Sequence, residues 1–234
     1  MNNEVLTGYT MSDKAEIDDF KKIYKPYYSK GGSNQELGIK GLKGTSDKVE
    51  EYAVNILDNK QSIDARIFLW KAGRLEKKDL GEEVDDGLKI QNGRGFEINN
   101  AKKFIDTVKD DLKIVSDSKE DFQRYYEYLL NKSKESQLKN VGAVYLITVL
   151  FFLSKGTYPI YDYYAHRAVK ALFLNKKPCE VFVGAAPDKT EKDKVIAMYI
   201  EYCYLLEKVF GRKNIERDLD QALWVYGHAT ERFK

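Results

Sequence analysis

Cysteine, histidine and proline are scarce in this sequence of 234 residues, which contains two cysteines, two histidines and four prolines. Cys179 and Cys203 are too few for a disulfide framework or a four-cysteine metal site, which indicates a reducing compartment. His166 and His228 show no spacing typical of a metal site, such as HExxH. We therefore expect neither a metal nor another cofactor.

Long apolar runs and a strong excess of charge are also lacking. No apolar run approaches the roughly 18 residues of a membrane span, and the first residues do not have the basic-then-apolar pattern of a signal peptide. We therefore expect a cytoplasmic protein without a membrane partner. With 39 basic and 37 acidic residues, the net charge is only +2, which argues against nucleic-acid binding by bulk charge. The lysine-rich stretch 21–48 is a candidate local patch, although a solvated surface explains it more simply.

Apolar residues make up 43% of the chain, enough for a core, and most of them recur with helical spacing. The pattern predicts an all-α fold of eight or nine helices. We expect helices near 13–26 (limited by Pro26), 46–57, 63–73, 99–112, 122–130, 143–153, 163–173, 196–211 and 219–227. A glycine-rich loop, 29–45, and a polar loop, 74–97, with a small hairpin around 91–93, fall in an N-terminal region, 1–98. Residues 99–234 form the second region, and whether the two make one compact unit stays open.

A short motif, an apolar run and an aspartate follow one another in the second half of the chain. Leu138-Lys139-Asn140-Val141-Gly142 precedes the run, and Tyr158-Pro159-Ile160-Tyr161-Asp162 follows it, so that Asp162 lies twenty residues after Gly142. This order resembles the helix-hairpin-helix DNA glycosylases, whose signature is a Leu-Pro-Gly-Val-Gly hairpin, an apolar helix and a Pro-Ile/Val-x-Asp turn. The late segment 220–227, DQALWVYG, is similar to their Asn-Gln-Ala-Leu-x-x-x-Gly helix, so the resemblance covers about 138–230.

The resemblance implies two packed helical subdomains around the helix-hairpin-helix, and duplex DNA, including damaged DNA, as the partner. Backbone N–H groups of such a hairpin bind a phosphate without reading sequence, aided by the positive end of the next helix. Asp162 would stabilise positive charge at C1′ of an extruded nucleotide or activate a nucleophile. The other implied contacts are phosphates at Leu138, Lys139, Asn140, Val141, Gly142, Lys155 and Arg167, and an extruded base between Tyr158 and Tyr161.

Several positions depart from the signature. Lys139 and Asn140 replace its Pro and first Gly, although Asn tolerates a left-handed backbone and Lys139 adds a cation. Val144 stands where the bifunctional enzymes have their catalytic lysine, so a lyase route is not supported. Residues 62–70 contain Asp64 but not the catalytic glutamate of the adenine glycosylases, and the four-cysteine cluster loop is absent.

Simpler interpretations stand beside these roles. Asp162 follows a turn and suits an N-cap of the helix 163–173, and one aspartate can serve both purposes. Lys155 is better explained as a solvated or phosphate-facing cation at a helix C-terminus than as a nucleophile. We expect His166 at the surface rather than in acid–base chemistry. Three hypotheses remain: a monofunctional DNA glycosylase that uses Asp162, a catalytically inactive nucleic-acid- or protein-binding module on the same fold, and a resemblance that is accidental or limited to the fold.

Overall fold

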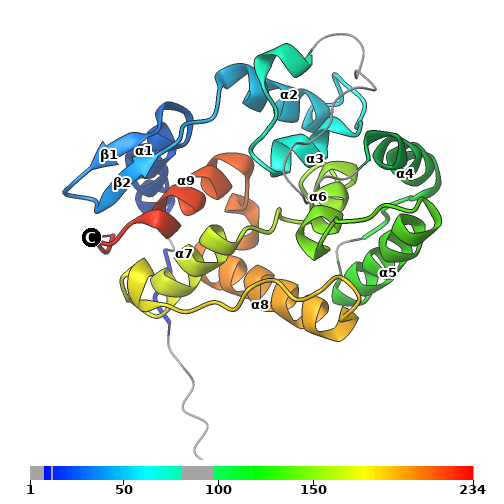
Figure 1. Cartoon of the computed structure of the whole chain (residues 1–234). Helices are drawn as coiled ribbons and strands as arrows, with labels where there is room; N and C mark the ends of the chain where they lie inside the picture. The colour runs from blue at the N-terminus through cyan, green and yellow to red at the C-terminus, as the bar shows by residue number, and fades with distance from the viewer. Residues whose placement is uncertain (1–7, 12, 81–96, 117, 234) are drawn as a thin grey trace, which may run out of the picture. The chain divides into compact units, whose positions relative to one another are not determined.

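The computed structural model describes residues 8–11, 13–80, 97–116 and 118–233. Within them 61% of the residues are helical and the strands form only one small two-stranded sheet, which confirms the predicted all-α class (Figure 1). The α-helices are α1 (Lys14–Lys30), α2 (Asp47–Leu57), α3 (Arg66–Lys71), α4 (Ile98–Asp111), α5 (Lys119–Glu135), α6 (Ala143–Leu153), α7 (Tyr163–Phe173), α8 (Lys192–Phe210) and α9 (Arg217–His228). Short 3-10 turns are η1 (Lys77–Leu80), η2 (Pro178–Glu180) and η3 (Arg212–Asn214), and two short strands are β1 (Gly32–Asn34) and β2 (Ile39–Leu42).

The chain divides into two compact units, each assembled from segments that are distant in sequence. The first unit consists of Met1–Gly44, Tyr161–Ala185 and Tyr199–Lys234, and the second of Thr45–Ile160 and Ala186–Met198. The boundary expected at residue 98 falls inside the second unit. The small hairpin expected at 91–93 lies outside the described residues.

In the first unit, α9 packs against both α1 and α7. Tyr226 of α9 contacts two aromatic rings of α1, with ring centroids 5.5 Å from Phe20 and 5.0 Å from Tyr24. Gly227 allows α9 to approach α7, because a Cβ atom at this position would lie 2.0 Å from the carbonyl oxygen of Tyr164. The late glycine of the sequence motif therefore has a packing role here.

Helix α1 is longer than its sequence predicts. Asp13 caps it by accepting a hydrogen bond from the N–H of Ala15 at 3.0 Å, but the helix continues through Pro26 to Lys30. Proline removes one N–H and one helical hydrogen bond, a cost that the buried face of α1 offsets by its packing on α9. Beyond Gly31, the region expected as a loop forms the antiparallel β1–β2 hairpin, with Gly32 opposite Leu42.

In the second unit, α6 packs against α3 and α5. Leu146, Ile147 and Leu150 are completely buried, as expected for a helix that is apolar nearly all round. Burial of each such side chain contributes roughly 1.5–3 kcal/mol to stability. Trp70 of α3 contributes an edge-to-face contact with Phe152, with ring centroids 5.2 Å apart. Among the described residues, no helix combines the length and apolarity needed to cross a membrane.

Candidate functional site

The segment between α5 and α6 is a tight hairpin. Gln137 and Asn140 both adopt left-handed backbone conformations, with φ values of 53° and 59°. Leu138 and Val141 are buried, each with 2% of its surface exposed. They anchor the hairpin to the core of the second unit, of which it is a part. The residues expected to face a ligand, Lys139, Asn140 and Gly142, are exposed. Asparagine thus occupies the left-handed position where the resembled signature has glycine.

The hairpin uses its carbonyl groups within the protein, whereas two of its N–H groups have no protein acceptor among the described residues. The carbonyl oxygen of Gln137 accepts from Asn100 Nδ2 at 3.2 Å, and that of Leu138 accepts from Lys189 Nζ at 3.2 Å. In the part of the chain that the structure describes, no acceptor pairs with the backbone N–H of Lys139 or Gly142. Gly142 is also the N-cap of α6, and the space where its Cβ would lie is open. Positive ends of peptide dipoles are therefore concentrated at this exposed corner.

Lysine side chains surround the hairpin. Lys139 belongs to it, Lys134 lies in the last turn of α5, and Lys189 reaches it from the segment before α8. Burial lowers the pKa of Lys189, and the positive charge of Lys134 lowers it further, against the opposing effect of Asp188. Among the described residues, none of these three ammonium groups has a carboxylate within ion-pair distance. The corner thus combines two unpaired N–H groups, those of Lys139 and Gly142, with three cations that form no ion pair among the described residues.

Asp162 lies in the first unit, whereas the hairpin lies in the second. It is the N-cap of α7, and its Oδ1 accepts a hydrogen bond from the N–H of Tyr164 at 2.8 Å. The Asp162 side chain is half-buried. The pKa of Tyr161 is raised mainly by the burial of Tyr161 itself and then by the negative charge of Asp162. The capping role considered from the sequence is therefore present in the structure.

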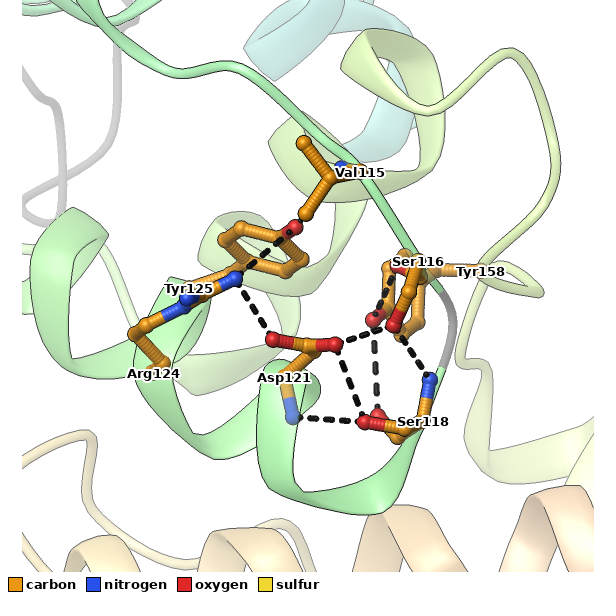
Figure 2. Close-up of polar contacts among 7 residues, drawn as sticks. All are labelled: Val115, Ser116, Ser118, Asp121, Arg124, Tyr125 and Tyr158. Atoms are coloured by element: carbon orange, nitrogen blue, oxygen red, sulfur yellow. Dashed lines mark hydrogen bonds and ion pairs between the residues drawn. The ribbon is translucent and has the colours of Figure 1, made fainter.

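The two tyrosines expected to line a base pocket are both buried. Tyr158 is 3% exposed, its hydroxyl donates to the carbonyl of Ser116 at 2.9 Å, and its ring lies edge-on to Tyr125 at 5.9 Å (Figure 2). Tyr161 is 1% exposed, and its hydroxyl is 3.2 Å from His166 Nδ1. Neither ring has an open face for a base, which differs from the expectation of an open pocket. Both rings are part of the packed interior, Tyr158 in the second unit and Tyr161 in the first.

The two cations expected to bind phosphate bond to carbonyl groups of the protein. Lys155 Nζ donates to the carbonyl of Ile56 at 2.7 Å, just before the end of α2, and burial lowers the pKa of Lys155. Lys155 also lines a cavity of about 490 Å³. Arg167 Nε donates to the carbonyl of Gly227 at 2.8 Å, at the end of α9. Both side chains therefore stabilise helix C-termini in this structure.

The expectation that His166 lies at the surface is wrong. His166 is 1% exposed, because helical periodicity places it on the same face of α7 as Ala165 and Val169. Its Nε2 lies 3.9 Å from a carboxylate oxygen of Glu201. Burial is the main cause that lowers the pKa of His166, to about 4, so the imidazole is neutral at neutral pH.

Asp64 is the acidic residue of the segment 62–70, which lacks the catalytic glutamate of the adenine glycosylases. Its carboxylate accepts several hydrogen bonds from the protein. Its carboxylate pairs with Arg66 at 2.7 Å and accepts from the hydroxyl of Tyr52 at 2.9 Å and the N–H of Arg66 at 2.8 Å. Arg66 and Tyr52 therefore hold this carboxylate within the protein structure. Across residues 8–11, 13–80, 97–116 and 118–233, no group of three or more His, Cys, Asp or Glu side chains is arranged to hold a metal ion.

Comparison with known proteins found no match to any protein-family model, to any curated protein or to any solved structure. Function must therefore be argued from the site itself. The residues that the sequence did not indicate are Asn100, Lys134 and Lys189, which the fold brings to the hairpin from α4, α5 and the segment before α8. No spacing rule connects these positions with 138–142.

Proposed function

We propose that this protein binds the sugar–phosphate backbone of DNA through the hairpin 138–142. The observation that carries the proposal is the division of hydrogen bonding in the hairpin: carbonyl groups are bound by Asn100 and Lys189, while N–H groups of Lys139 and Gly142 have no protein acceptor among the described residues. An N–H array at the start of a helix favours an anion, and a phosphate oxygen accepts two such bonds at once.

The properties of the corner favour a nucleic-acid backbone over a free anion or an acidic peptide. The donors are backbone groups, which bind phosphate regardless of base sequence, and the nearby ammonium groups suit repeated negative charges along a strand. Gly142 leaves room for the close approach of a strand. The resemblance to helix-hairpin-helix DNA glycosylases points the same way and adds damaged duplex DNA as the specific partner.

Two versions of the proposal differ in the role of Asp162. In the first, the protein is a monofunctional DNA glycosylase in which Asp162 stabilises charge at C1′ during hydrolysis, and Val144, at the position of the family's catalytic lysine, gives no support to a lyase route. In the second, it is a catalytically inactive module that binds DNA or a partner protein. The second version is favoured by the capping bond from Tyr164 to Asp162 and by the burial of Tyr158 and Tyr161.

A matched pair of variants at Gly142 tests DNA binding. Gly142→Pro removes the N–H group, and its φ of −84° suits proline, while Gly142→Ala keeps the N–H and places a Cβ in open space. A hydrogen bond to a charged group contributes about 1.5–3 kcal/mol, so Gly142→Pro should weaken binding by roughly tenfold or more, and Gly142→Ala should not. Fluorescence anisotropy with a labelled duplex carrying a tetrahydrofuran abasic-site analogue measures both affinities. Wild-type protein that fails to bind at low salt ends the proposal.

The Asp162→Asn variant separates the two versions. Asparagine caps a helix about as well as aspartate, so the fold and DNA binding should be retained. A catalytic Asp162 predicts that release of damaged bases from a duplex, followed by alkaline cleavage of the product strand, is lost in this variant. If wild-type protein binds these duplexes and releases no base from any of them, the binding module is the correct version.

A further inference from the structure

Lys189 is the best-placed cation beside the hairpin, and its backbone is fixed. The hydroxyl of Tyr126, a completely buried residue of α5, donates to the carbonyl of Lys189 at 2.9 Å. The following turn is held by Asp188, whose Oδ1 accepts from the N–H of Thr190 at 2.9 Å. The side chain then extends to the Leu138 carbonyl, across 51 positions of sequence. A lysine anchored at both ends is unlike a mobile surface lysine, which loses rotamer entropy on binding.

Among the described residues, Lys189 forms no ion pair, and the charge of Asp188 acts on it only from beyond ion-pair distance. The ammonium group of Lys189 donates one hydrogen bond to the carbonyl of Leu138, and no described carboxylate forms an ion pair with this group. In the same unit, Lys132 pairs with Glu135 at 2.7 Å and Lys192 with Glu127 at 2.9 Å. Lys134 and Asp188 act on Lys189 in opposite directions, and a further anion bound at the corner would stabilise this half-buried cation.

We propose that Lys189 bridges the hairpin to the DNA, with its ammonium group donating both to the carbonyl of Leu138 and to a backbone phosphate. The inference rests on the proposed function, since it assigns a residue to the same interface. In this arrangement the bond to Leu138 fixes the hairpin so that the N–H groups of Lys139 and Gly142 face the strand. The remaining donors of Lys189 add a charge-assisted contact to that strand. The interface therefore includes the segment before α8, far from the hairpin in sequence.

Salt dependence distinguishes a phosphate contact from a purely structural role. Each phosphate neutralised on duplex DNA contributes about 0.9 to the slope of log affinity against log salt concentration. Lys189→Met should therefore weaken binding to the abasic-analogue duplex by about tenfold at low salt and reduce the slope by about 1. Lys189→Arg, which keeps the charge, should restore the slope. Lys192→Met, which removes a neighbouring lysine paired with Glu127, is the matched control and should leave it unchanged.

The alternative outcomes are separable. Weaker binding with an unchanged slope would mean that Lys189 only supports the hairpin, and equal binding by Lys189→Met and wild type would remove it from the interface; either result overturns the proposal. Circular dichroism establishes that each variant is folded. Lys189→Gln repeats the measurement with an uncharged polar side chain that keeps a donor group, in case the methionine variant is unstable. Failure of the wild-type protein to bind at any salt concentration overturns the proposed function, and the role of Lys189 with it.

Discussion

The neutral, buried imidazole of His166 should make stability depend on pH. The pKa of His166 is about 4 in the folded protein and 6.5 in an unfolded chain, so the unfolded chain takes up a proton first as the pH falls. Stability contributed by His166 is therefore complete above pH 6.5 and decreases as the pH falls toward 4. At about 1.36 kcal/mol for each pH unit between these two values, the whole effect is about 3 kcal/mol, and between about pH 7 and about pH 5 it is about 2 kcal/mol.

Urea unfolding at these two pH values measures the effect, with His166→Asn as the comparison. The asparagine amide lies near the position of Nδ1, so it keeps a hydrogen bond with Tyr161 but cannot take up a proton. Other groups titrate equally in both proteins, so the wild type should lose about 2 kcal/mol more than the variant on acidification. Equal losses in the two proteins would refute the reasoning and imply that His166 is hydrated or that Glu201 compensates its charge.

Two further predictions concern α7. Asp162→Ala should destabilise the protein by about 1 kcal/mol in urea unfolding, because the cap on Tyr164 is lost, while Asp162→Asn should be nearly neutral; equal destabilisation by both would show that the charge matters more than the cap. Gly227→Ala should lower stability by about 1–3 kcal/mol, since its Cβ would overlap the carbonyl of Tyr164, whereas Gly184→Ala enters open space and should have little effect. Similar melting temperatures for the two glycine variants would contradict the close packing of α7 on α9.

The elements that sequence predicted best are those whose signals are local. Helix α6 was predicted at 143–153, the range the structure has, because its apolar residues fill every face and glycine marks its start. Asp162 as an N-cap follows from a preference that operates within three residues. The end of α1 was missed, since proline has a strong local cost and only the tertiary contacts of α1 with α9 offset it. The β1–β2 hairpin was missed because glycine-rich segments carry little pattern.

The candidate site was harder to predict than the fold, because it depends on burial and on distant segments. Tyr158 and Tyr161 flank Asp162 in sequence, which suggested a pocket, yet hydrogen bonds to Ser116 and His166 keep them inside. The sequence does not distinguish a tyrosine whose ring is exposed from one whose ring is buried in the core. Lys189 had no sequence signal at all, because its relation to the hairpin exists only once Tyr126 has positioned its backbone.

The pairing of α1 with α9 has a consequence for the way the chain acquires its structure during synthesis. Lys21 bonds to Glu216 at 2.7 Å, and the carbonyl of Gly38 accepts from the N–H of Thr230 at 3.3 Å, so α1 and the β1–β2 hairpin are completed by α9 and the residues next to it, which are synthesised much later. Contacts so distant in sequence form slowly, and until they form, the apolar face of α1 stays uncovered. Nascent chains stalled before α9 should therefore depend on chaperones, whereas chains that include α9 should not.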